Sequence, residues 1–421
     1  MPAPFLIKNA TVIQEGHPRH LKQSDILISN GRIEKIAAKI DAKAQLIQGD
    51  DLRVSVGFHD LRSHLSDPGM EYKEDLSQLL ETAAAGGFTS ISTLPATQPV
   101  VDHKSAIQYI VNKSASALTD VYPMGAVSEK MEGVHLAELY DLHEHGAIAF
   151  TDADRNLSSG LLKKALLYVQ PFNGLIVSLP LNRSLHHDGM VNESPQTVST
   201  GLKTRPAIAE YSQLRQQLDV LEYCGGRIHF TGISTAESVR LIKEAKKKGL
   251  HVTCDVALYN LCFTDKEVQQ FDANFKCLPI LRSEKDRKAL IKGIQEGVVD
   301  AICSNHHAQN VEVKRVEFDY AETGTINLQT AQSLYEMFLK DQLDEATFIK
   351  CWTSNPRTLL GIEVNTIAEG EAANLVVFDR KGNWKLDITT NKSGGTNTHL
   401  WNTALRGKVI ATFNQKSVNF Y

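Results

Sequence analysis

The chain has 421 residues, a hydrophobic fraction of 42% and a formal net charge of −4, enough for one large domain plus an accessory one. The weak negative charge excludes the basic surface of a nucleic-acid-binding protein, and no segment approaches the roughly 18 apolar residues of a membrane span. The first residues lack the pattern of a signal peptide and the six cysteines form no CxxC pair, so we expect a cytoplasmic protein with reduced, buried thiols.

Both ends of the chain read as short strands separated by turns. Residues 5–13 and 25–37 carry alternating apolar side chains, and the pair Asn30-Gly31 predicts a two-residue hairpin. Residues 374–380 and 405–421 have the same character. Because the termini of a domain often lie close together, we predict one small β-sandwich domain formed by residues 1–56 and 365–421.

The middle of the chain alternates between helical and strand-like patterns. Four segments with helical spacing are each followed by a strand-like run: 73–87 then 88–94, 207–226 then 227–234, 235–249 then 251–258, and 283–297 then 298–304. Two of these helices begin at good N-cap residues, Ser234 or Thr235 and Ser283. Repeated α-then-β units predict a parallel sheet. Their number favours an α/β fold with a (β/α)8 TIM-type barrel over residues 57–364.

The segment GFHDLRSHLSDPGMEYKEDLSQLLETAAAGGFTSISTLPATQPVVD, residues 57–102, resembles the first conserved block of the dihydroorotases of the amidohydrolase superfamily. That block usually reads G-F-x-D-x-H-x-H-L-R-x-P-G, then A-A-A-G-G-F-T, then M-P-N-T-x-P-V-x-D. The similarity continues through HGAIAFTDAD, RIHFTGIST, ICSNHHAQ and SNPRTLLGI and covers nearly the whole chain. It implies a barrel flanked by a β-sandwich built from both termini.

The resemblance also implies a metal site whose ligands are changed in this chain. Dihydroorotases hold two zinc ions at the barrel mouth, which share a hydroxide that attacks the cyclic amide. Only the second histidine of the His-x-His pair is kept, as His64. The other ligand positions correspond to Arg62, Ala153, Leu179, Gly232 and Asn305. A one-residue shift would bring Asp152 or Asp154 to the position of Ala153.

Two further positions that normally hold the substrate carboxylate are also changed. The arginine after the second histidine corresponds to Ser66, and the asparagine of M-P-N-T corresponds to Ala96. A guanidinium about 4 Å from a divalent ion would repel it by roughly 8 kcal/mol at an effective dielectric of about 20. We therefore expect no metal and no other cofactor, and we predict that Arg62 replaces the missing cation by pairing with Asp60, Asp152 or Asp154.

Because these ligand and substrate-binding positions are changed, our main hypothesis is that the chain is a non-catalytic dihydroorotase-like protein of pyrimidine biosynthesis. The chain resembles inactive dihydroorotase-like subunits that assemble with aspartate transcarbamoylase, so we expect a homo- or hetero-oligomer with that enzyme as the partner. The alternative is a residual or altered cyclic amidohydrolase with at most one metal, held by His64, Asp152, Asp154 and His306. A third hypothesis is a ligand-binding sensor. For the pair His306-His307 we expect one buried and one exposed ring, because adjacent residues on a strand face opposite ways.

Overall fold

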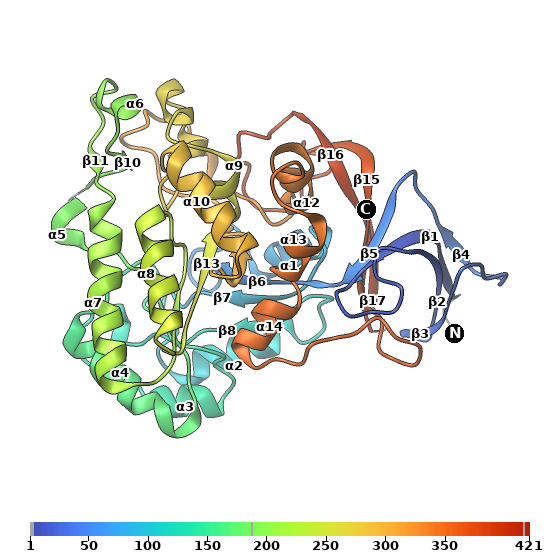
Figure 1. Ribbon diagram of the computed structural model, residues 1–421, viewed down its shortest axis with the longest axis horizontal. Coiled ribbons are helices and arrows are strands. Elements are labelled where there is room, and N and C mark those ends of the chain that lie inside the picture. Colours follow the sequence, from blue (N-terminus) through green and yellow to red (C-terminus); the bar gives the residue numbers. More distant parts are fainter. Residues whose placement is uncertain (1–3, 187, 416) are drawn as a thin grey trace.

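The computed structural model describes residues 4–421 except residues 187 and 416. A ring of short parallel strands surrounded by helices forms one side of the molecule, and a larger sheet that contains both termini forms the other (Figure 1). This is the α/β architecture predicted from the sequence.

The terminal sheet joins strands from the two ends of the chain in the order β17-β16-β15-β5-β1-β2-β3, with β4 beside β1. Its strands are β1 Phe5–Ile13, β2 Gln23–Ser29, β3 Arg32–Ala37, β4 Gln45–Ile47, β5 Leu52–Val56, β15 Asn374–Lys385, β16 Ala404–Asn414 and β17 Ser417–Phe420. The two halves meet where β5 pairs antiparallel with β15, with Val54 opposite Val377. The prediction that both ends form one β unit is confirmed. The domain boundaries at residues 56 and 365 stay a prediction.

The hairpin between β2 and β3 forms at the expected place. Ser29 pairs with Arg32, so the loop consists of Asn30 and Gly31 alone. Their φ angles of 52° and 77° are those of a type I′ turn, which only residues tolerant of positive φ adopt readily.

The barrel consists of parallel strands arranged in a closed ring. Its strands are β6 Phe58–Ser63, β7 Phe88–Thr93, β8 Asp120–Pro123, β9 Ile176–Ser178, β12 Ile228–Phe230, β13 Val252–Ala257 and β14 Ala301–Cys303. One position is reduced to a single residue, Phe150, which bridges Gly125 after β8 to Ile176 in β9. A parallel bridge from Ser63 to His306 closes the ring. With Phe150 counted, the ring has the eight positions of the predicted barrel.

Helices of six or more residues cover the outside of the ring. These are α1 Leu76–Ala85, α2 Lys104–Ser114, α3 Leu139–Glu144, α4 Ser159–Val169, α7 Ile208–Cys224, α8 Ala236–Lys247, α10 Glu284–Gln295, α13 Glu345–Lys350 and α14 Ser354–Leu360. Single-turn helices and a short ribbon lie in the connections: α5 Arg183–His186, β10 Val191–Asn192, α6 Pro195–Val198, β11 Thr204–Arg205, α9 Leu258–Cys262, α11 Val311–Lys314 and α12 Ala331–Leu334. The side chains of Thr235 and Ser283 cap α8 and α10 as predicted.

The remaining global expectations concern membranes and cysteines. None of the helices in the described part of the chain is long and apolar enough to cross a membrane. All six cysteines are free thiols. Four of them are buried, whereas Cys224 and Cys262 are partly exposed, so the expectation of burial was wrong for those two. Cys224 is the last residue of α7 and therefore lies at the edge of the core.

Candidate functional site

Arg62 lies inside the barrel, on strand β6 near its carboxyl end, where catalytic groups of barrel enzymes gather. Its side chain is 1% exposed. Nε donates to Oδ1 of Asn305 at 2.9 Å, and Nη2 donates to a carboxylate oxygen of Asp154. Nη1 is buried and meets no acceptor among the described residues. The predicted pairing of Arg62 with a carboxylate at the barrel mouth is thus confirmed for Asp154.

The other two proposed partners of Arg62 bind elsewhere. Asp60 accepts hydrogen bonds from the hydroxyls of Ser63 and Ser304, at 2.6 and 2.7 Å. Asp152 accepts from the backbone N–H and the hydroxyl of Ser128, at 3.0 and 2.5 Å. Burial raises the pKa of both carboxyl groups, although these hydrogen bonds oppose the rise.

Ala153 separates the two carboxylates that the sequence left as alternatives. Its φ of 51° places it in the left-handed region, and its methyl group is buried in an apolar cluster. The chain therefore reverses between Asp152 and Asp154. One carboxylate turns to Ser128 and the other to Arg62, so they do not share one site.

The position that the family resemblance assigns to a fourth metal ligand, Gly232, is closed by apolar neighbours. Gly232 has a φ of 63°, and a Cβ there would lie 2.7 Å from Cγ of Pro279 and 3.3 Å from Cδ1 of Leu179. The cavity beside these residues has a volume of about 10 Å³, the space of about one water molecule. A histidine side chain does not fit in this arrangement.

Asn305 completes the floor of the site. Its Oδ1 accepts from Arg62, and its Nδ2 donates to the carbonyl oxygen of Leu278 at 2.9 Å. Both ends of the amide are therefore occupied. An amide also cannot take up a proton at neutral pH, so Asn305 cannot act as the proton shuttle that an aspartate provides.

The histidines near the barrel mouth interact with protein groups. The rings of His64 and His307 are stacked, with centroids 3.8 Å apart and planes 4° from parallel. Burial lowers the pKa of both rings well below the ordinary value, and the charge of Arg62 adds to this for His64. His306 is buried as expected, but His307 is also largely buried, so the expectation of one exposed ring was wrong. Strand β14 ends at Cys303, and the alternation of a strand does not extend to these residues.

Glu74 is a buried residue that sequence reasoning missed. Nε2 of His306 lies 3.1 Å from a carboxylate oxygen of Glu74, while Nδ1 of His306 accepts from the backbone N–H of Asn327. This pattern assigns the proton to Nε2, which donates to Glu74. The same carboxylate accepts from the hydroxyl of Ser393 at 2.5 Å and from the backbone N–H of Gly394 at 3.1 Å. Glu74 therefore fixes the loop between β15 and β16 to the barrel.

The two positions that the family resemblance assigns to substrate binding, Ser66 and Ala96, carry no charge. Ser66 is 5% exposed, and Ala96 packs against the apolar cluster that also contains Ala153. Neither side chain can form the charged or bidentate contact that holds a carboxylate.

The residues at the mouth do not fit a zinc ion. Zinc requires three or four nitrogen, sulfur or oxygen ligands at fixed geometry. Within residues 4–421, leaving out 187 and 416, no group of three or more His, Cys, Asp or Glu side chains is placed to hold a metal. The fallback set of His64, Asp152, Asp154 and His306 is thus not brought together. Each of these side chains contacts a different protein group.

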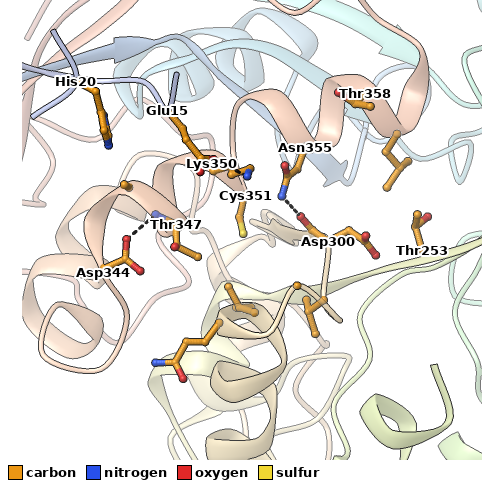
Figure 2. A pocket seen from close by; sticks show the side chains of 16 residues that line it. Glu15, His20, Thr253, Asp300, Asp344, Thr347, Lys350, Cys351, Asn355 and Thr358 are labelled. Atoms are coloured by element: carbon orange, nitrogen blue, oxygen red, sulfur yellow. Dashed lines mark hydrogen bonds and ion pairs between the residues drawn. The ribbon is translucent and has the colours of Figure 1, made fainter. Parts of the chain in front are cut away.

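Two sizeable cavities lie at opposite ends of the barrel. The cavity at the mouth has a volume of about 610 Å³ and is lined in part by Asp154, Arg205 and Lys276. The other, of about 500 Å³, lies near the amino ends of β13 and β14 (Figure 2). The carboxylates of this second cavity have protein partners: Glu15 binds Lys350 at 2.5 Å, Asp300 binds Lys246 at 2.7 Å, and Asp344 accepts from the backbone N–H of Thr347 at 2.9 Å. The amino-terminal face of a barrel usually serves stability, so the mouth is the candidate site.

The fold and sequence comparisons agree on the class of protein. The structure superimposes on L-hydantoinase (dihydropyrimidinase) from Arthrobacter aurescens with a TM-score of 0.86, at 20% identity over 99% of this chain and 96% of the other. Dihydropyrimidinase from Brevibacillus agri gives a TM-score of 0.81, also at 20% identity, over 99% of this chain and 94% of the other. The architecture is therefore that of a TIM-type barrel with a β-sandwich, as predicted.

The sequence comparisons define the family within that class. The dihydro-orotase-like family model matches residues 52–238, and the amidohydrolase family model matches residues 208–414. The chain is 36% identical over 389 residues to a dihydroorotase of Caldicellulosiruptor saccharolyticus, covering 91% of this chain and 90% of the relative. It is 36% identical over 414 residues to a dihydroorotase of Aquifex aeolicus, covering 97% of each. The chain belongs to the dihydroorotase family of amidohydrolases.

Proposed function

We propose that this chain is a non-catalytic member of the dihydroorotase family that serves pyrimidine biosynthesis as a structural subunit. The observation that carries the proposal is the ion pair at the barrel mouth between the buried Arg62 and the partly exposed Asp154. A guanidinium that is 1% exposed and bonded to Asp154 and Asn305 stands where the resemblance expects a metal ligand. A buried cation and a divalent ion repel each other strongly at such a distance.

The geometry around this pair supports the proposal independently. A hydroxide on two metals needs several ligands in one place, whereas here the remaining histidines and carboxylates bind other protein groups. A side chain at Gly232 would meet Pro279 and Leu179 at 2.7 and 3.3 Å from its Cβ. Restoring a metal site would therefore require changes in several strands and loops at once.

The catalytic part of the proposal is tested by measuring the hydrolysis of dihydroorotate with added zinc. The dihydroorotase of Aquifex aeolicus, purified and assayed in the same way, is the positive control. We expect no rate above the uncatalysed background for this chain. Zinc-dependent turnover that rises with the concentration of this chain would contradict the proposal and support the alternative, a residual cyclic amidohydrolase with one metal.

The proposed partner is aspartate transcarbamoylase. The chain retains the complete family fold while the residues at the mouth differ from the expected ligands, and such retention suits a scaffolding role. Mixing the chain with the aspartate transcarbamoylase of the same organism and measuring mass by light scattering tests this part. We expect one larger species. Two unchanged peaks over the full concentration range would contradict it.

A further inference from the structure

An exposed apolar strip lies on the outer helices α3 and α4, on the part of the barrel far from the terminal sheet (Figure 1). Phe172, three residues after the end of α4, forms its centre. The ring centroids of Tyr140 on α3 and Tyr168 on α4 lie 5.5 and 6.5 Å from that of Phe172. Leu167 precedes Tyr168 on the exposed face of α4, and Tyr140, Leu167 and Tyr168 are 40–51% exposed. A contiguous apolar group of this kind on a surface marks a contact site, whereas single exposed apolar residues do not.

One end of the strip is basic. Lys163 and Lys164 precede Leu167 and Tyr168 by one turn of α4, and residues four apart on a helix share a face. Both lysines are exposed, and the ammonium group of Lys163 lies 5.0 Å over the ring of Tyr223 at the end of α7. Neither lysine forms an ion pair within the part of the chain that the structure describes, so both charges are available to a partner.

The other end of the strip is acidic. Glu144 follows Tyr140 by one turn of α3, is exposed, and forms no ion pair with any described residue. Glu138, at the start of the same helix, is also exposed. Asp141 lies between them and is already paired with Lys104, at 3.5 Å. Along the surface the strip therefore runs from free positive charges through an apolar centre to free negative charge.

We propose that this strip is the contact surface of a homodimer, in which two copies of the chain meet around a two-fold axis near Phe172. Such an axis lies in the plane of contact and crosses the middle of the strip, so it places the lysines of each copy opposite Glu144 of the other. The same rotation brings the two apolar centres together, where aromatic side chains supply most of the contact area. A strip with charges of one sign at both ends would repel a second copy. The inference does not depend on whether the chain is catalytic or binds aspartate transcarbamoylase.

The test is the mass of the purified full chain in sedimentation velocity experiments at concentrations up to about 100 µM. We expect a species with twice the mass of one chain. Leu167→Asp should raise the Kd of this dimer at least about tenfold, because the substituted residue occurs twice in a two-fold interface. Its monomer should stay folded, since Leu167 is half-exposed. Ile388→Asp is the matched control, because Ile388 is 81% exposed in the loop between β15 and β16, and it should leave the Kd unchanged.

Charge reversal tests the two-fold arrangement itself. Lys164→Glu and Glu144→Lys should each raise the Kd about tenfold, because each change turns two attractions across the interface into repulsions. The double variant restores opposite charges at the two ends, so its Kd should return to within about threefold of the wild-type value. Both side chains are exposed, so these changes do not disturb the core.

A chain that stays monomeric up to about 100 µM, or a dimer that Leu167→Asp does not weaken, would overturn the proposal. A double variant with a Kd no lower than those of the single variants would overturn the pairing of the two ends. Association with aspartate transcarbamoylase alone, weakened by Leu167→Asp, would assign the strip to that enzyme and overturn the homodimer.

Discussion

Replacing Asp154 by alanine should destabilise the protein more than replacing Arg62 by methionine, although each change breaks the same ion pair. The reason is the difference in burial, since the side chain of Arg62 is 1% exposed and that of Asp154 is 36% exposed. Without the carboxylate, the guanidinium stays buried with Asn305 as the acceptor for Nε alone. Without Arg62, the carboxylate can be hydrated, and methionine fills the space with apolar atoms.

The expected changes in the free energy of unfolding follow from the different burial of Arg62 and Asp154. Leaving a buried charge without its partner costs about 3–5 kcal/mol, and we take the lower end because water can enter beside residue 154. Replacing a buried charge by an apolar side chain of similar length changes stability by about 1 kcal/mol or less. With an unfolding entropy of ~2.1 cal/mol/K per residue over a barrel of roughly 300 residues, 3 kcal/mol lowers Tm by about 5 °C.

Thermal and guanidinium unfolding of Asp154→Ala, Arg62→Met and the double variant measure this asymmetry. The double variant should have the same free energy of unfolding as Arg62→Met, because the buried guanidinium is absent from both. Asp188→Ala is the control, since its side chain is 86% exposed and its change should stay within about 0.5 kcal/mol. Equal losses of unfolding free energy in the two single variants, or a double variant as unstable as Asp154→Ala, would refute the argument from burial.

Three further predictions concern the surroundings of this pair. Burial and the nearby charge of Arg62 lower the pKa of His64, so the folded protein keeps this ring neutral. Below the unfolded pKa of about 6.5 the unfolded chain binds a proton that the folded protein does not, and the free energy of unfolding falls as the pH falls. His64→Phe should therefore reduce the loss of stability between pH 7.5 and 5.5 by about 1 kcal/mol in unfolding titrations. Glu74→Ala should destabilise the loop at residues 387–402 by about 2–3 kcal/mol and speed its amide hydrogen exchange, whereas unchanged exchange would show that Glu74 does not hold the loop. Gly232→His should lower Tm without creating zinc affinity, because a Cβ there lies 2.7 Å from Pro279; a stable variant that binds zinc would contradict the packing argument.

The sequence predicted the barrel and the terminal sheet because local patterns determine them. The Asn30-Gly31 turn and the caps Thr235 and Ser283 each act over a few residues, and each forms as expected. The barrel strand at Phe150 is reduced to a single residue, which no periodicity could indicate.

The sequence predicted those features of the site for which the residue type alone excludes metal binding, as for Arg62 and Gly232. The partner of Arg62 could only be narrowed to three carboxylates, because the choice depends on the reversal of the chain at Ala153. Glu74 and His307 both bind the loop between β15 and β16, through Ser393 and Asn397, and this loop lies more than 300 residues from Glu74 in the sequence. Glu74 stands beside Asp75, the N-cap of α1, in a polar run that suggests an exposed turn. Only the contacts with His306 and Ser393 explain its burial.

The most direct test of the central claim is the zinc content of the full-length protein, purified in the presence of zinc, freed of loosely bound metal and measured by elemental analysis. The Aquifex aeolicus dihydroorotase, treated in parallel, is the reference. With Arg62 bonded to Asp154 and Asn305 at the mouth of the barrel, we predict only trace zinc in this chain. One zinc ion or more per chain, lost when His64 is replaced, would contradict the account.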